Sequence, residues 1–178
     1  LRLMRAHTGL IRTADVLAMG IHPRTLYQLR DSGALQQLSR GVYRVVGQDP
    51  ISNPDLVTVA VRCPRAVICL ISALSFHEIT TQVPHTVSIA IPKGSEPPRI
   101  DYPPVSVHHF SKESFSVGIE QHESDGVPIQ VYSPEKTLAD CFKFRNLIGK
   151  EVILEALKLY RKRNGFDVSA LLKYARVC

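Results

Sequence analysis

Residues 20–33, GIHPRTLYQLRDSG, have the signals of a short helix at both of their ends. Gly20 suits the left-handed position that closes a preceding helix, and Pro23 fits a first helical turn because it needs no amide donor there. Gly33 ends the segment. Because a helix of about ten residues is not stable alone, we expect its neighbours in the chain to hold it.

The side chains of this helix divide into two faces. On a helical wheel Leu26 and Leu29 share one side and are expected to pack against other elements. Arg24, Gln28 and Asp31 lie nearly opposite. Arg24 and Gln28 are one turn apart, and arginine and glutamine are the usual partners of guanine and adenine in the major groove. The pattern predicts a DNA recognition helix; the alternative is a solvated polar face that docks another protein.

The flanking segments give this helix its context. Residues 1–8 resemble the end of a first helix, which Gly9 breaks, and residues 13–20 predict a second helix with Thr13 as its N-cap. Residues 34–46, ALQQLSRGVYRVV, predict a β-hairpin around the turn SRG. Helix, helix, turn, helix and hairpin is the order of a winged helix-turn-helix.

The positive charge of the chain is concentrated at its start. Residues 1–47 hold seven arginines, two aspartates and no lysine, a net charge of +5. The fifteen basic and fourteen acidic residues of 48–178 leave only +1. Arginine favours two-pronged contact with phosphate or guanine, so this asymmetry favours DNA binding, although a compositional bias toward arginine is the alternative.

The rest of the chain predicts a second domain. Residues 47–55, GQDPISNPD, form a turn-rich linker, so we place the domains at 1–47 and 48–178. Hydrophobic periodicity then predicts helices at 54–63, 66–79, from Ser133 onward, 149–163 and 167–176, and strands at 86–91, 105–110, 117–122 and 127–132. The predicted fold class is α+β: a winged helix-turn-helix followed by a mixed α/β domain with a small sheet and C-terminal helices.

The cysteine spacing and the hydropathy of the chain indicate the cellular compartment in which the protein is expected. Four cysteines without CxxC spacing are expected to be buried, reduced thiols in a cytoplasmic protein: Cys63, Cys69, Cys141 and Cys178. The longest apolar run, residues 66–71, is far short of the roughly 20 residues that a membrane helix needs, so no membrane partner is expected. The chain starts with Leu rather than Met, so upstream residues are expected to be missing.

Neither a metal site nor catalysis is expected, and no cofactor is predicted. His108 and His109 are adjacent on a predicted strand and therefore point to opposite faces. His77 and Glu78 are adjacent too, but no HExxH motif follows. A magnesium nuclease would need an Asp followed by Glu-x-Lys on strands; Glu135 and Lys136 lack the spacer, and no Ser or Cys is paired with a His at a recognised spacing. A nuclease fused to the winged helix is therefore a weaker alternative.

Two segments resemble a known family. Residues 9–45, GLIRTADVLAMGIHPRTLYQLRDSGALQQLSRGVYRV, resemble the N-terminal winged helix of the AbiEi family, the antitoxins of type IV toxin–antitoxin systems. Residues 133–149, SPEKTLADCFKFRNLIG, are similar to the S-x-E-R-T-L-x-D element near the start of that family's C-terminal helices. Together the two motifs cover both ends of the chain.

The resemblance implies a cytoplasmic bacterial repressor that binds inverted repeats upstream of its own operon. The C-terminal domain would then act as the antitoxin, opposing a nucleotidyltransferase-type toxin without necessarily forming a stable complex with it. The family's basic C-terminal surface would be represented by Lys158, Arg161, Lys162 and Arg163. The alternative is an adaptor whose winged helix binds only protein.

These considerations select two sets of residues. The expected DNA contacts, with Arg40 and Arg44 assigned to the phosphate backbone, are Arg12, Thr13, His22, Arg24, Thr25, Tyr27, Gln28, Arg40 and Arg44. In the helix that begins at Ser133, we expect Leu138, Ala139, Cys141 and Phe142 to be core residues. The basic residues of that helix region, expected to be exposed and to add to the partner surface, are Lys136, Lys143 and Arg145.

Overall fold

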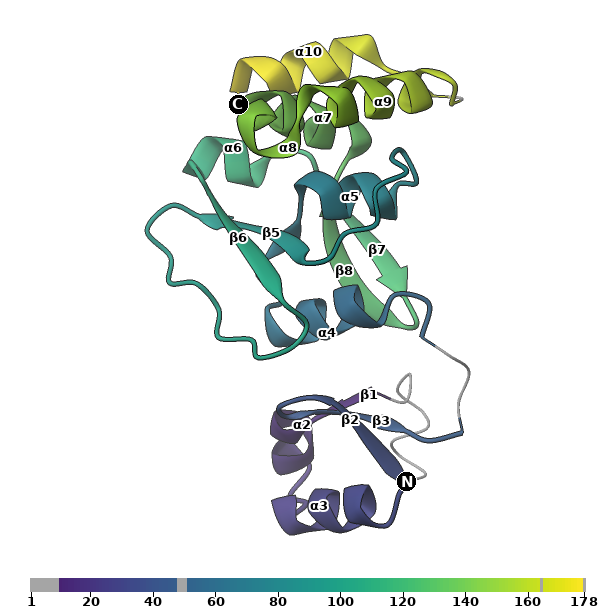
Figure 1. Cartoon of the computed structure of the whole chain (residues 1–178). Helices are drawn as coiled ribbons and strands as arrows, with labels where there is room; N and C mark the ends of the chain where they lie inside the picture. Colours follow the sequence, from purple (N-terminus) through teal and green to yellow (C-terminus); the bar gives the residue numbers. More distant parts are fainter. Residues whose placement is uncertain (1–9, 48–50, 164, 178) are drawn as a thin grey trace.

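The computed structural model describes residues 10–47, 51–163 and 165–177 (Figure 1). Helices and strands are interspersed along the chain, and the strands form two separate β-sheets. The predicted α+β class is confirmed. The first helix, predicted within residues 1–8, lies outside the described residues. Among the described residues, none of the helices has the length and apolar character needed to cross a membrane.

Residues 10–47, called the N-terminal unit below, contain the smaller sheet. Its elements are β1 (Leu10–Arg12), α2 (Thr13–Ala18), α3 (Pro23–Asp31), β2 (Leu35–Ser39) and β3 (Val42–Val45). The three strands are antiparallel in the order β1-β3-β2. The hairpin and both helices agree with the sequence, but β1 was not predicted. Its three residues form a strand because they pair with β3. The local sequence pattern does not predict this long-range pairing.

The ends of α3 follow the sequence signals. His22 is the N-cap, and its Nδ1 accepts a hydrogen bond from the amide of Arg24 at 3.2 Å, with Pro23 in the first turn. Gly20 and Gly33 have φ angles of +73° and +75°, a conformation that favours glycine. The expected N-cap of α2 was wrong: Arg12 holds that position, and no side chain caps the helix.

The helices of the N-terminal unit pack on one face of its sheet. The buried residues that form this small core are Ile11, Val16, Leu26, Leu35, Tyr43 and Val45. Leu26 is fully buried and comes from α3, so the helix that is too short to stand alone is held by apolar contact with the sheet and α2.

Residues 51–177, called the C-terminal unit below, contain the larger sheet. Its helices are α4 (Pro54–Arg62), α5 (Leu70–Phe76), α6 (Lys112–Ser116), α7 (Pro134–Lys143), α8 (Arg145–Ile148), α9 (Lys150–Arg161) and α10 (Val168–Val177). Its strands are β4 (Val67–Ile68), β5 (Val87–Pro92), β6 (Val105–Phe110), β7 (Ile119–Ser124) and β8 (Val127–Tyr132). They form a mixed sheet in the order β6-β5-β4-β8-β7, in which β4–β8 and β5–β6 are parallel pairs.

Helices cover both faces of this five-stranded sheet. One buried cluster joins α4 to the strands, and the other joins α5, α7 and α9 to them. In Figure 1 the layers follow one another from α4 through the sheet and α5 to α7–α10. The predicted helix at 66–79 was partly wrong, because its first residues pair as β4 in the centre of the sheet. The predicted hairpin is confirmed, with Asp125 and Gly126 at φ +53° and +74° in its turn.

The two units meet through the outer face of the small sheet and α4. Arg62 of α4 donates one hydrogen bond from its guanidinium to the carbonyl of Arg40 and another, at 2.8 Å, to the carbonyl of Arg99. Leu10 of β1 packs against the apolar cluster around α4. The turn between β2 and β3 is thereby placed against α4.

Candidate nucleic-acid interface

The outer face of α3 has the side chains that the helical wheel predicted. Arg24, Thr25 and Gln28 are exposed, and the side chain of Tyr27 is 45% exposed. Leu26, between them in sequence, is fully buried. The helix therefore presents a polar surface with a guanidinium, a hydroxyl and an amide within two turns.

An ion pair at the end of α3 offsets its one acidic residue. Arg30 contacts the carboxylate of Asp31 at 2.8 Å, and its guanidinium lies 5.4 Å from the centre of the Tyr27 ring. Asp31 by itself would repel a phosphate. With Arg30 beside it, the exposed face of α3 carries a net positive charge from Arg24.

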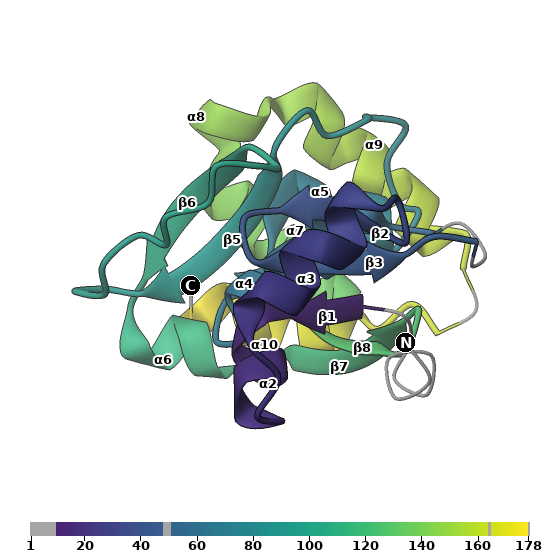
Figure 2. The same cartoon turned by 90° about the horizontal axis from the view of Figure 1, so that it is seen from below.

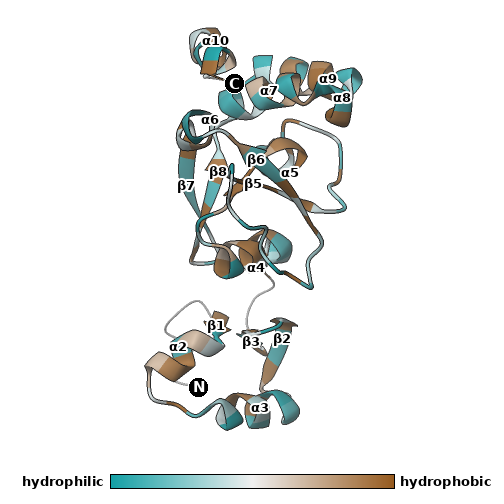
Figure 3. Ribbon diagram, turned by 90° about the vertical axis from the view of Figure 1, so that its left-hand side faces the viewer, coloured by the Kyte–Doolittle hydropathy of each residue, from teal (hydrophilic) through white to brown (hydrophobic). Residues whose placement is uncertain are grey.

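The position of α3 leaves this face accessible within the described chain. Figures 1 and 3 place α3 at the opposite end of the molecule from α10, and Figure 3 shows it mostly in hydrophilic colours. Seen from below, α2 and α3 lie in front of the larger sheet (Figure 2). The helix can approach a long, straight partner without interference from the described part of the C-terminal unit.

Arg12 and Arg40 do not lie beside this face. Arg12 is held by Asp15 through two hydrogen bonds of 2.7 and 2.9 Å, which lower the pKa of the Asp15 carboxyl group. Arg12 also lines a hollow with Val61 of α4. Arg40 is exposed, but the turn that carries it is bound by Arg62. Thr13, also predicted as a DNA contact, is half-buried, and its amide donates to the Gly41 carbonyl of that turn.

Arg44 lies on the other face of the small sheet from α3. Alternate residues of a strand point to opposite faces, and Tyr43 and Val45 belong to the core under the helices. Arg44 therefore points away from that core, and it is paired in register with Leu10, which packs toward α4. The structure thus groups His22 and the α3 residues, and it separates Arg12, Thr13, Arg40 and Arg44 from them.

A second basic surface lies on the helices at the far end. Its exposed members, at the α7–α8 junction and at the end of α9, are Lys143, Arg145, Lys158, Arg161, Lys162 and Arg163. Arg163 contacts Glu78 at 3.4 Å. These residues lie on the opposite side of the large sheet from α3 (Figure 1), so the two predicted surfaces are separate.

The prediction that Lys136 is exposed was wrong. Its side chain is completely buried, and its ammonium group donates to both carboxylate oxygens of Asp140, at 2.5 and 2.6 Å. Ser133 caps the helix as expected by accepting from the amide of Lys136. Sequence reasoning missed this pair because a lysine and an aspartate four residues apart are usually a solvated surface pair.

The other expectations for α7 were mostly correct. Leu138, Ala139 and Cys141 are buried, whereas Phe142 is 40% exposed and is not a core residue. Burial raises the pKa of the Cys141 thiol, which is a free cysteine like Cys69. Cys63 is only half-buried, and Cys178 lies outside the described residues.

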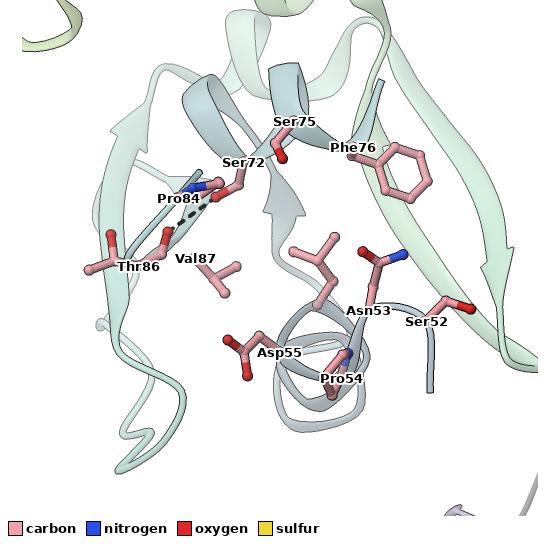
Figure 4. A pocket seen from close by; sticks show the side chains of 11 residues that line it. Ser52, Asn53, Pro54, Asp55, Ser72, Ser75, Phe76, Pro84, Thr86 and Val87 are labelled. Atoms are coloured by element: carbon pink, nitrogen blue, oxygen red, sulfur yellow. Dashed lines mark hydrogen bonds between the residues drawn. The ribbon is translucent and has the colours of Figure 1, made fainter. Parts of the chain in front are cut away.

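A pocket of about 190 Å³ lies between the start of α4 and α5. Figure 4 shows Ser72, Ser75 and Phe76 of α5 on one side and Asn53 and Asp55 on the other. A hydrogen bond of 3.2 Å joins Ser72 to the carbonyl of Thr86 at its edge. With one carboxylate and three serines but no basic side chain in its lining, the pocket offers no site for an anionic ligand.

Comparison with known proteins gives likenesses of fold among solved structures and a match to a family model. A solved structure, described as the crystal structure of RV2827C protein from Mycobacterium tuberculosis, superposes with a TM-score of 0.64 at 15% sequence identity. The match covers 94% of this chain and 66% of the mycobacterial chain, just under two thirds of its length. At that identity the likeness concerns the fold alone.

A comparison with curated proteins gives no match. Residues 1–46 match the family described as "Transcriptional regulator, AbiEi antitoxin". The predicted relation is therefore confirmed for this part of the chain, which has the N-terminal signature of the AbiEi antitoxin family of transcriptional regulators.

Proposed function

We propose that this chain is a DNA-binding transcriptional repressor whose first domain, residues 1–47, works as a winged helix-turn-helix. The observation that supports this most is the outer face of α3, where Arg24 and Gln28 are exposed one turn apart opposite the buried Leu26. The +5 charge of residues 1–47 and the family match at residues 1–46 support it as well.

In this proposal α3 enters the major groove with its N-terminal half. Arg24 has the geometry to contact guanine and Gln28 to contact adenine, with Thr25 and Tyr27 beside them. The amide of Arg24 is already bonded to His22, so phosphate contact at the helix start falls to side chains. The short β2–β3 turn faces α4, so we assign Arg12, Arg40 and Arg44 no base contact.

We further propose that residues 48–178 form the antitoxin domain of a cytoplasmic bacterial regulator and act by binding rather than by catalysis. The partner would be a nucleotidyltransferase-type toxin encoded in the same operon. The exposed basic side chains at the α7–α8 junction and the end of α9 support such a surface, since they suit an acidic patch or a nucleic acid bound by that toxin.

Replacing Arg24 with alanine is expected to weaken binding to the preferred DNA by about 1–3 kcal/mol and to relax the preference at one base pair. The loss follows from removing a two-pronged contact with a base. The measurement uses the full chain and a duplex that the wild-type protein selects from a random pool, with a scrambled duplex beside it, in gel shifts at two salt concentrations.

The matched control for this measurement is Arg40→Ala, which removes the same charge from the same unit but from the turn beside α4. We expect it to leave the base preference unchanged. For the wild type, each tenfold rise in salt concentration is expected to lower the logarithm of the binding constant by about 0.9 for every phosphate that the protein contacts. If both variants lose the same amount on both duplexes, charge alone drives binding and α3 reads no bases.

Reversing the charge of Lys143 and Arg145 to glutamate is expected to weaken protection from the toxin while leaving DNA binding intact. Both side chains are exposed on the side of the large sheet that faces away from α3. The measurement compares growth of cells that express the neighbouring toxin gene with gel shifts on the selected duplex. Lys112→Glu, an exposed lysine on α6, serves as the control, and equal loss of both activities would contradict two separable surfaces.

A further inference from the structure

Three potential metal ligands meet where the end of α5 faces the edge strand β7. His77 follows the last residue of α5, and Glu120 and His122 are two residues apart on β7, so both project from one face of the strand. One ligand atom from each of the three residues lies within 4.8 Å of the others. The fold thus joins a histidine and a Glu-x-His pair that lie more than forty residues apart in the sequence.

The ring of His77 is held in a fixed orientation. Its Nε2 lies 2.8 Å from the carbonyl oxygen of Tyr132, and because a carbonyl only accepts, Nε2 donates and the lone pair is on Nδ1. Metal-binding histidines typically donate their second ring N–H to a backbone carbonyl in this way. The ring of Phe76 packs edge-on against both imidazoles. Its centre lies 5.4 Å from the centre of the His77 ring and 4.9 Å from that of the His122 ring.

The other two ligands are already in contact and reach solvent. Nε2 of His122 lies 3.0 Å from Oε2 of Glu120, and the two side chains are 34% and 43% exposed. One side of the cluster is therefore buried and oriented, and the other is open to an incoming ion. Glu78, adjacent to His77 in sequence, points elsewhere: it is exposed and contacts Arg163.

We propose that His77, Glu120 and His122 form a binding site for a divalent late first-row transition ion, with Zn²⁺ as the best fit. Two imidazoles and one carboxylate are a usual zinc donor set, and tetrahedral Zn²⁺ with bonds near 2.0–2.2 Å places its ligands roughly 3–3.5 Å apart. The present separations, all within 4.8 Å, have to shorten to that distance on binding, which calls for rotation of the partly exposed Glu120 and His122 side chains. Three protein ligands leave the fourth position to water or to an external donor.

A bound ion would connect the edge strand of the large sheet to the end of α5. Among the described strands β7 pairs with β8 alone, so it is an edge strand with one side of its backbone left unpaired by the sheet. The ion would therefore stabilise this edge, since any ligand that binds only the folded state adds to its stability. This site is independent of the proposed DNA binding, because α3 contributes no ligand to it.

The test is a zinc titration of the full chain, prepared without a histidine tag and stripped of metal with a chelator. We expect one Zn²⁺ per chain by calorimetry and a rise in melting temperature on its addition. His122→Gln is expected to weaken binding by at least the 10–100-fold that loss of an outer-shell partner costs, and Glu120→Gln is expected to weaken it in the same direction. His109→Gln, an exposed histidine on β6, is the control and should bind as the wild type does.

Cobalt absorption identifies the ligands themselves. Co²⁺ at this site is expected to give the visible bands of nitrogen and oxygen coordination without charge transfer from thiolate. His122→Gln and Glu120→Gln change partly exposed residues of an edge strand, so they are expected to fold even if His77 variants do not. Unchanged zinc affinity in His122→Gln, a thiolate band, or no saturable binding at all would overturn the assignment, leaving Glu120 and His122 as an ordinary ion pair.

Discussion

Replacing Asp140 with asparagine is expected to lower the free energy of unfolding by about 3–5 kcal/mol, because it leaves the ammonium group of Lys136 buried without a counter-charge. Both side chains are completely buried, and the two are joined by paired hydrogen bonds.

The surroundings of Lys136 prevent it from turning outward. Its Nζ lies 5.0 Å from the centre of the Phe110 ring and 4.6 Å from that of Tyr132. Gly118 packs against its stem so closely that a Cβ added there would lie 2.7 Å from the Cβ of Lys136. The lysine is thus enclosed by two aromatic faces and a backbone segment, and its ammonium group donates hydrogen bonds to Asp140 and to the hydroxyl of Ser114.

Urea unfolding of the full chain, followed by circular dichroism, measures the loss. The double variant Lys136→Met with Asp140→Leu is the matched control, because replacing a whole buried ion pair with apolar side chains is often neutral or stabilising. We expect the double variant to recover most of what Asp140→Asn loses. A single variant as stable as the wild type would mean that the pair is not buried in solution.

This pair changes the assignment of one residue in segment 133–149. The helix was expected to be structural, with Lys136, Lys143 and Arg145 exposed, yet Lys136 points into the protein together with Asp140. Ser133 at the N-cap and Leu138 in the core likewise serve the fold. The partner surface, if α7 contributes to it, begins at the end of the helix with the exposed Lys143.

Local signals in the sequence predicted much of the secondary structure. A proline after an N-cap marked the starts of α3 and α7, and an Asp-Gly pair marked the β7–β8 turn, because these residues restrict the backbone within a few positions. The exposed face of α3 followed from helical periodicity alone. Each of these features depends on residues close together in the chain.

Features that depend on distant partners were missed. β1 is a strand only because β3 pairs with it, and β4 only because β5 and β8 lie on either side. The side of the small sheet that carries Arg44 follows from how that sheet meets α4. The ligand cluster of His77, Glu120 and His122 is formed by elements that the sequence leaves far apart. None of these contacts has a signature within a short window of sequence.

Replacing Leu26 with alanine is expected to unfold the N-terminal unit while the C-terminal unit stays folded. A fully buried leucine costs about 2–5 kcal/mol when it is cut to alanine. The buried core around Leu26 has only six residues among the described part of the unit, and small units have little stability to lose. The larger sheet has its own two clusters, to which Leu26 does not belong.

Hydrogen exchange of the full-length variant locates the loss. Amides of residues 10–47 should exchange freely, amides of 51–177 should keep their protection, and DNA binding should disappear. Tyr27→Ala, at the neighbouring exposed position of α3, should leave exchange unchanged, since surface substitutions rarely alter stability by more than about 0.5 kcal/mol. If Leu26→Ala removes protection from both units together, they fold as one cooperative body and the division at residue 47 is wrong. If exchange separates them as expected, the recognition helix depends for its stability on a core of its own.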